Sequence, residues 1–432
     1  MLVIVLRVLG GAHKGTGEPP GTTLAQLQPE KFTAPTIEFV NPESGSGVAL
    51  VPGQVDVVVV GAGVIGLSVA WRAAQAGMSV VTADPEPGRG ASWAAAGMLA
   101  PVTELHYGEE GLLALNLAAA RRWDGFAAEL AAVAGPVGYL RSGTLLVAAD
   151  EDDRVWAREL FEYQQSLGLE VEWLSASAAR ELEPALAPGV RAALWAPHDH
   201  QVHNRQLIAA LLTAATAAGV QLVGEAVEEI ERTGPAVSGV RLASGRSLSC
   251  GAVVLAAGCW SPLVGGLPPA AVPAVRPVKG QILRLGRSSQ GPLLGRSVRA
   301  VVEGSSLYLV PRQDGSLVVG ATVEERGFDT TVVAGAVYEM LRDARRVVPG
   351  VSEMVLDEAV AGLRPGSPDN GPVVGAVSSV PGLVLATGHY RNGILLAPVT
   401  ADAVVALLAG GEPPPELAAF GPDRFAASAV PC

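Results

Sequence analysis

Cysteine is scarce in this chain, and its distribution disfavours a cross-linked scaffold. The three cysteines, Cys250, Cys259 and Cys432, form neither a CxxC motif nor a framework of pairs. Such usage is typical of buried or incidental thiols in a reducing compartment. We therefore expect no disulfide and no metal held by cysteine.

Positive charge is also in short supply. The chain has 30 lysines and arginines against 42 acidic residues, which gives a formal net charge of −12 at pH 7. This surplus of negative charge disfavours nucleic acid or an anionic membrane as the main partner. With 49% hydrophobic and 17% charged residues over 432 positions, the composition predicts a well-buried globular protein of two or three domains.

Long uninterrupted apolar segments are lacking too. Residues 247–275 carry no charge, but prolines and glycines interrupt them from Pro262 to Pro273, which a lipid-exposed helix tolerates poorly. We expect a buried strand, a turn and a Pro-rich crossover there. The apolar first nine residues lack a basic n-region and a clean cleavage site. These features predict a soluble, cytoplasmic protein.

The most informative feature that is present is a glycine-rich turn. The β-branched run 55–60 leads into Gly61-Ala-Gly63-Val-Ile-Gly66, and a helical pattern follows. The first glycine allows a tight turn, the second lets a pyrophosphate approach, and the third lets helix pack on strand. The phosphates would bind at the helix N-terminus.

An acidic residue at the tip of the next strand completes this motif. Asp84 ends the run Ser79-Val-Val-Thr-Ala and lies at the distance expected for a ribose-binding carboxylate. The sequence therefore predicts an adenine dinucleotide site. Its contacts are expected from Gly61, Gly63, Val64, Ile65, Gly66 and Asp84.

Hydrophobic periodicity and turn residues predict the remaining elements. Helices are expected over residues 64–76, 111–133, 151–167, 203–218, 332–347 and 394–408. Buried strands are expected over residues 55–60, 79–84, 143–148, 220–223, 252–258, 360–363 and 382–388. A group punctuated by turns, residues 279–285, 306–311 and 316–322, indicates antiparallel strands and a second domain inside the first.

Other polar clusters fit plainer roles. His198-Asp-His200-Gln-Val-His203 lacks the spacing of a metal site and lies just before a helix, which favours a polar loop. Glu151-Asp152-Asp153 is typical of an acidic helix start. A Gly-x-Ser-x-Gly element in its proper context is missing, so a hydrolase is unsupported.

Several further segments together resemble the glycine/D-amino-acid oxidase family of flavoproteins. The resemblance runs from Val55 to about Gly411. The segments that carry it are 91–101 (Ala-Ser-Trp-Ala-Ala-Ala-Gly-Met-Leu-Ala-Pro), 278–281 (Val-Lys-Gly-Gln), 308–312 (Tyr-Leu-Val-Pro-Arg), 320–322 (Gly-Ala-Thr), 361–366 (Ala-Gly-Leu-Arg-Pro-Gly) and 388–398 (Gly-His-Tyr-Arg-Asn-Gly-Ile-Leu-Leu-Ala-Pro).

The resemblance implies an α/β fold in which a Rossmann-like FAD-binding domain is interleaved with an α+β substrate domain built on an antiparallel sheet. We expect the FAD-binding domain over residues 54–105, 195–270 and 358–412. The substrate domain is expected over 106–194 and 271–357. Residues 1–53 are expected to form a loose N-terminal extension, and 413–432 a C-terminal tail.

The implied cofactor is noncovalent FAD, because the cysteine that holds flavin in related sarcosine oxidases has no counterpart in 388–398. Small side chains in 92–98 would let backbone amides approach a flat ring, and a helix start near 394 would stabilise negative charge on the reduced flavin. The further FAD contacts expected are Ser92, Ala95, Ala96, Gly97, Met98, Gly258, His389, Arg391, Asn392, Gly393, Ile394 and Leu395.

Arg364 is the residue expected to bind the substrate carboxylate. It follows an apolar strand in a glycine-flanked turn, and arginine binds carboxylates with two parallel charge-assisted bonds. The resemblance adds Tyr308 on the same carboxylate and Arg391 as a second arginine that could instead position its loop. Two positions depart from the family pattern: Asp84 replaces the commoner glutamate, and Ser306 rather than a histidine stands before Tyr308.

The implied activity is oxidative deamination of glycine and small related amines such as sarcosine and short D-amino acids. Hydride transfer to flavin N5 would give an imine without a dedicated protein base, so no catalytic side chain is named. The products would be a 2-oxo acid, ammonia and, with oxygen as the second substrate, hydrogen peroxide. The family link is to thiamine thiazole synthesis. A flavin dehydrogenase with another acceptor, a noncatalytic dinucleotide-binding protein and homo-oligomer formation stay open.

Overall fold

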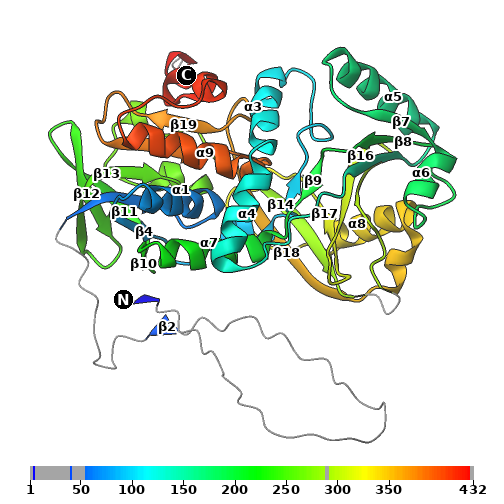
Figure 1. Cartoon of the computed structure of the whole chain (residues 1–432), viewed down its shortest axis with the longest axis horizontal. Helices are drawn as coiled ribbons and strands as arrows, with labels where there is room; N and C mark the ends of the chain where they lie inside the picture. The colour runs from blue at the N-terminus through cyan, green and yellow to red at the C-terminus, as the bar shows by residue number, and fades with distance from the viewer. Residues whose placement is uncertain (1–2, 5–38, 41–53, 288–290, 429–432) are drawn as a thin grey trace, which may run out of the picture.

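Figure 1 shows the computed structural model as two lobes side by side, with helices α3 and α4 between them. The structure describes residues 3–4, 39–40, 54–287 and 291–428. Each lobe is built on its own sheet, and the chain passes between the lobes several times. The fold is mixed α/β, as predicted.

The first lobe has a parallel centre made of apolar strands. β3 (Val55–Val60), β4 (Val80–Ala83), β10 (Gln221–Val223), β13 (Ser247–Leu255) and β20 (Leu383–Thr387) pair in parallel, in the order β20-β13-β3-β4-β10. Valine and leucine fill these strands because helices and other strands cover both faces. β11 (Val227–Thr233), β12 (Ala236–Leu242) and β19 (Val373–Ala376) add antiparallel pairs.

Three helices cover one face of this sheet. α1 (Val64–Gln75) packs against both α7 (Asn204–Ala217) and α9 (Gly393–Leu408), and their apolar side chains form one continuous core. α1 begins directly after β3, and α9 begins shortly after β20. Both helix N-termini therefore lie at the carboxyl edge of the parallel strands, where ligands bind in open α/β sheets.

The second lobe contains an eight-stranded sheet. Its order is β18 (Leu356–Gly366), β14 (Arg276–Leu285), β17 (Leu317–Gly320), β16 (Ser305–Pro311), β15 (Ser297–Val302), β6 (Thr144–Ala148), β8 (Ala192–Ala196) and β7 (Glu172–Ser175). All pairs are antiparallel except β15 with β6. The antiparallel group predicted from the sequence is thus present, with this parallel pair as an addition.

Helices cover this sheet as well. α8 (Ala334–Val347) packs on the strands from β14 to β17, while α5 (Glu151–Ser166) packs on β6 and β8 and α6 (Ala176–Leu182) on β7 and β8. The acidic start of α5 is capped by Asp150, whose side chain accepts from the N–H of Asp153.

The single helix expected over 111–133 is wrong. The structure has α3 (Glu110–Ala120) and α4 (Trp123–Ala134), with a turn at Arg121 and Arg122. The two halves pack on different partners, α3 on α9 and α4 mainly on α7, so the chain must change direction between them. Trp123 fixes the break by donating its indole N–H to the carbonyl of Leu395, at 2.9 Å.

The strand expected over 360–363 is longer in the structure. β18 pairs with β14 along its whole length, from Leu356 opposite Leu285 to Gly366 opposite Arg276. This part of segment 358–412, expected in the FAD-binding domain, therefore lies in the second sheet, as do Trp195 and Ala196 in β8. The full length of β18 depends on pairing with a strand far away in the sequence, so the residues of a short window do not predict it.

The two ends of the chain also differ from simple extensions. Most of 1–53 lies outside the described residues, but β1 (Val3–Ile4) and β2 (Phe39–Val40) pair beside β10 at the edge of the first sheet. In segment 413–432, Leu417 and Phe420 are buried near α3 and β19. Across the described part of the chain, every helix is too short or too polar for a membrane crossing.

The Trp123 bond gives a test of how the helices between the lobes are held. Trp123→Phe should lower the free energy of unfolding by about 1–3 kcal/mol, because the buried Leu395 carbonyl loses its donor. Denaturant titration measures the change. Trp156→Phe on the exposed side of α5 is the matched control, since its ring is 40% exposed. Equal effects for the two variants would contradict the assignment.

Candidate active site

A cavity of about 1350 Å³ lies where the two lobes meet. Its lining joins the β3–α1 turn, segment 89–98 and the start of α9 from the first lobe to one face of the second sheet. Of the predicted cofactor residues, those at its surface are Gly61, Gly63, Val64, Ile65, Asp84, Ser92, Ala95, Ala96, Gly97, Met98, Gly258, His389, Arg391, Gly393 and Ile394.

The glycine turn has the geometry that the sequence predicted. Gly61 has φ +103°, and a Cβ there would lie 2.5 Å from the carbonyl oxygen of Ala256. A Cβ on Gly66 would lie 1.9 Å from the carbonyl oxygen of Gly61, so Gly66 serves helix packing rather than the cavity wall. The N-cap residue Gly63 offers no side chain, and the first amide of α1, Val64 N–H, donates instead to Ser92 Oγ at 2.9 Å.

Asp84 holds the end of β4 against this turn. Its carboxylate accepts the N–H groups of Ala62, at 2.7 Å, and Glu86, at 2.8 Å. Burial raises the pKa of Asp84, and the bond from Ala62 opposes the rise. The carboxylate lies at the cavity, as expected for a ribose-binding group.

The start of α9 forms another wall. Gly388 turns the chain after β20 with φ +72°, and α9 begins at Gly393 without a capping side chain. His389 is buried, and its Nε2 lies 3.0 Å from Thr400 Oγ1. Burial lowers the pKa of His389 to about 3, so its ring is neutral.

Three predicted cofactor residues are not brought to the cavity: Gly66, described above, and Leu395 and Asn392. Leu395 is buried in the helix core, where its carbonyl accepts from Trp123. Asn392 is buried at the start of α9 and is absent from the cavity lining. Leu395 packs in the core that α9 forms with α1, α3 and α4.

Arg364 reaches the cavity from within β18, not from a turn after a strand as expected. Its guanidinium lies over Gly280 of β14, where a Cβ would come within 2.3 Å of Nη2. Nη1 donates to the carbonyl of Thr322 at 3.0 Å. In the described part of the chain Arg364 forms no ion pair, so the guanidinium keeps donors for an external carboxylate.

Tyr308 lies on the same sheet face. In the strand register it stands opposite Gly320 on one side and Arg299 on the other, and its ring covers Gly320. Burial raises the pKa of Tyr308 above its usual value, so the phenol stays protonated and can donate a hydrogen bond.

Arg391 is the second predicted arginine, and it is paired. Its guanidinium forms an ion pair with Glu109, and both side chains are largely buried. The contact fastens the start of α9 to the chain before α3. This supports a positioning role for Arg391, the alternative that the sequence left open.

Sequence reasoning missed several polar residues of the cavity. Arg299 and Glu104 form a largely buried ion pair beside Tyr308, and His106 lies close by. Burial, followed by the charge of Arg391, lowers the pKa of His106. An arginine alternating within the apolar strand Ser-Val-Arg-Ala-Val-Val was the signal that could have indicated Arg299.

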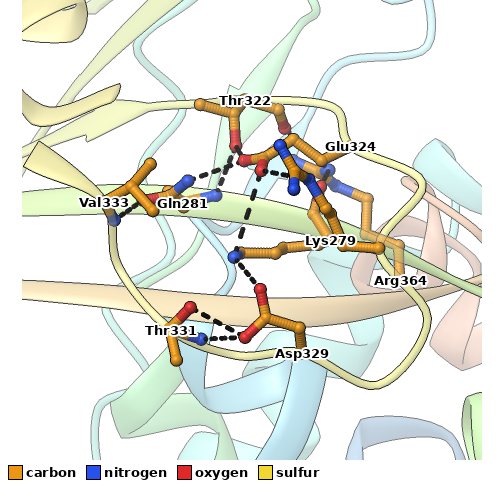
Figure 2. A network of polar contacts seen from close by, with 9 residues as sticks. Lys279, Gln281, Thr322, Glu324, Asp329, Thr331, Val333 and Arg364 are labelled. Atoms are coloured by element: carbon orange, nitrogen blue, oxygen red, sulfur yellow. Dashed lines mark hydrogen bonds and ion pairs between the residues drawn. The ribbon is translucent and has the colours of Figure 1, made fainter. Parts of the chain in front are cut away.

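Figure 2 shows a network of polar contacts that holds the loop between β17 and α8. Lys279 is 1% exposed, and its Nζ lies 2.8 Å from Asp329 Oδ2. Glu324 Oε1 accepts from Gln281 at 2.7 Å and from Thr322 at 2.6 Å. The hydrogen bond from Lys279 holds the pKa of Asp329 well below its usual range. The network fixes the Thr322 carbonyl, which in turn orients Arg364.

The remaining polar tract has a structural role. His203 caps α7, with its Nδ1 3.3 Å from the N–H of Gln206, and His198 lies 3.0 Å from Glu170. Within the described residues no group of three or more metal-binding side chains occurs. The described cysteines, Cys250 and Cys259, are buried and unbonded, and burial raises their pKa to about 11 and 12.

The fold and this cavity define a flavin-dependent oxidoreductase. The FAD dependent oxidoreductase family matches residues 56–407, and the chain belongs to that family. The glycine turn, the two helix starts at the cavity and the small residues of 92–98 fit its cofactor, FAD.

Relatives of the chain are similar over most of its length. Glycine oxidases from Geobacillus kaustophilus and Pseudomonas putida are each 33% identical, over 85% of this chain and 97% and 98% of theirs. The bifunctional protein ThiO/ThiG of Synechocystis is 34% identical over 87% of this chain, but the match spans only 55% of that longer protein. The solved structure of the Geobacillus glycine oxidase superposes with a TM-score of 0.80 at 32% identity, covering 86% and 99% of the two chains.

The buried histidine predicts a pH dependence of stability. Because the folded-state pKa of His389 is about 3, the unfolded chain binds this proton first as pH falls below about 6.5. Stability should therefore fall by about 1 kcal/mol per pH unit between pH 6 and 4 through this group. Denaturant titrations at several pH values measure the slope. His389→Gln should make the slope shallower, with His203 and His106 still contributing, whereas His198→Gln on the surface should leave it unchanged. Equal slopes in all three proteins would refute the assignment.

Proposed function

We propose that this chain oxidises glycine and small related amines, such as sarcosine and short D-amino acids. The observation that carries the proposal is the guanidinium of Arg364, which forms no ion pair with any described residue and lies at the cavity beside the neutral phenol of Tyr308. An amino-acid carboxylate matches both groups, because arginine offers two parallel donors and the phenol a third. The similarity to glycine oxidases supports the choice of substrate.

The two side chains act by positioning. Arg364 binds the carboxylate, and the Thr322 carbonyl keeps its guanidinium in one orientation. Tyr308 donates to the same carboxylate, which fixes the orientation of the substrate in the cavity. Such orientation can contribute about 7–11 kcal/mol relative to a free encounter. No side chain needs to act as a base when the amine reacts in its neutral form.

The cofactor residues divide the remaining work. We assign the pyrophosphate to the start of α1 at Gly61–Gly66, the ribose to Asp84, and the flavin ring to segments 92–98 and 388–394. When bound, FAD would supply the two-electron acceptor for the α-hydrogen of the substrate; with oxygen as the final acceptor, the two electrons, this hydrogen and the proton lost by the amine would leave as hydrogen peroxide. The imine product would hydrolyse to ammonia and a 2-oxo acid, and for glycine this acid is glyoxylate.

The biological role and the cellular compartment of the reaction are proposed from the similarity to relatives and from the composition of the chain. The match to ThiO/ThiG proteins supports a role in forming the thiazole of thiamine. Scarce cysteine supports the cytoplasm as its compartment. We retain the predicted division into an FAD-binding and a substrate domain, with β18 assigned to the sheet of the latter.

Reduction of the bound flavin is the direct test. Glycine, sarcosine and D-alanine added without oxygen should bleach the yellow absorbance of the purified protein, and air should restore it with release of peroxide. Absorbance that persists with all three would refute the proposal. Bleaching followed by slow recovery without peroxide would instead indicate a dehydrogenase that uses another acceptor.

Arg364→Ala tests the carboxylate assignment. Loss of two charge-assisted bonds should raise the apparent substrate constant by at least about 100-fold, while flavin content changes little. Steady-state oxygen uptake and the flavin-to-protein absorbance ratio measure the two quantities. Arg345→Ala on the exposed face of α8 serves as the control. Loss of flavin with an unchanged substrate constant would make Arg364 a structural residue.

A further inference from the structure

Three arginines from separate elements meet behind the segment that backs the cofactor cavity. Arg205 lies on α7, Arg284 on β14, and Arg312 directly after β16. Their guanidinium groups donate to backbone carbonyls of the segment 93–96. Arg205 Nε and Arg284 Nη2 bind the Trp93 carbonyl at 3.4 and 3.1 Å, Arg284 Nη2 also binds that of Ala95 at 3.3 Å, and Arg312 Nη2 binds that of Ala96.

These bonds set the direction of the amides. In a planar trans peptide the carbonyl and the N–H of the next residue point in opposite directions. The N–H groups of Ala96 and Gly97 therefore point away from Arg284 and Arg312. Ala95, Ala96 and Gly97 line the cavity, whereas the three arginines do not. One layer of peptide thus separates the guanidinium groups from the cofactor space.

The surroundings neutralise the three arginines only in part: Glu358 contacts two of them, and Asp314 acts on Arg312 from a longer distance. Glu358 is 2.6 Å from Arg205 and 3.5 Å from Arg284, and it is the one described carboxylate within 4 Å of the group. Arg312 is 3% exposed, and its other acceptors are neutral: Gln201 Oε1, the Val202 carbonyl and Asn204 Oδ1.

The group keeps its charge at neutral pH. Burial, and then the neighbouring arginines, lower the pKa of Arg312 to about 9 and of Arg284 to about 10. Both therefore stay protonated at pH 7. His203 lies near them, but burial lowers its pKa to about 4, so it adds no charge.

We propose that Arg205, Arg284 and Arg312 form a rear cationic cluster that raises the reduction potential of the bound flavin. Reduction adds negative charge to the ring, and a fixed positive charge one peptide layer away stabilises that form. Solvent screens such a field weakly on the side of Arg284 and Arg312, whose side chains are largely buried. Uncompensated buried charge opposes folding, so the cluster would be expensive to keep for packing alone. The arginines act through the field and through the amides of Ala96 and Gly97, which makes them positioning residues.

Two substitutions with opposite predicted effects test the proposal. Glu358→Gln removes the nearest counter-charge, so it should shift the equilibrium toward reduced flavin. Arg205→Gln removes one cation from the half-exposed side of the cluster and should shift it the other way. A change of about tenfold in each direction corresponds to about 30 mV for a two-electron couple. The midpoint potential of the holoenzyme, measured against a reference dye during slow chemical reduction, is the readout.

The controls separate an electrostatic role from a structural one. Glu339→Gln and Arg345→Gln, exposed on α8, make the same charge changes away from the cavity and should leave the potential unaltered. If the cluster were merely structural, the midpoint potentials of both test variants would shift in the same direction, or neither would shift. Either result overturns the proposal. If Arg205→Gln does not fold, Glu358→Gln decides the sign alone.

This inference depends on the bound flavin, and not on the proposed substrate. The potential is measured without glycine or any other amine. If no amine reduces the flavin but the two variants shift its midpoint potential in opposite directions, the proposed function is refuted and the role of the cluster is supported. Rapid reduction by glycine with unmoved potentials would do the reverse.

Discussion

The close backbone contact at the β3–α1 turn is the constraint on which the rest of the site depends. Gly61 lies against Ala256 at the end of β13, and Gly66 lies against Gly61 itself, at distances that exclude any side chain. The contact joins the two central strands of the first sheet to the start of α1. With this turn in place, the N-terminus of α1 opens toward the cavity, and Asp84 can reach back to Ala62.

The second lobe supplies what the first cannot. A parallel sheet with helices offers amides and small residues for a cofactor, but few side chains that select a substrate. The flat face of the second sheet carries Tyr308, Arg299 and Arg364 in fixed register. Bare backbone at Gly280 and Gly320 gives two of these side chains room to lie flat. Cofactor binding and substrate choice are thus divided between two sheets that share one cavity.

Local patterns predicted much of this arrangement, and nonlocal contacts account for what they missed. The glycine turn, α7 and α9 were predictable because each depends on residues close in sequence. The break at Arg121 and Arg122 was not, since it arises from the different partners of α3 and α4. Arg364 was expected after a strand because its pairing with Val278 spans 86 positions. Lys279 was missed as a network residue because its partner Asp329 is 50 residues away. The roles of the predicted site residues remain predictions.

The interleaved strand order limits how far the protein can fold while it is being synthesised on the ribosome. β20, at residues 383–387, is a parallel neighbour of β13, and β18 completes the other sheet only after residue 356. Neither sheet can therefore close until most of the chain has been synthesised. Partners so far apart in sequence also make folding slow, and unpaired strand edges stay exposed in the meantime. Because the cofactor cavity needs both sheets, FAD can bind only a chain that is nearly complete. Its binding would then stabilise the association of the two sheets.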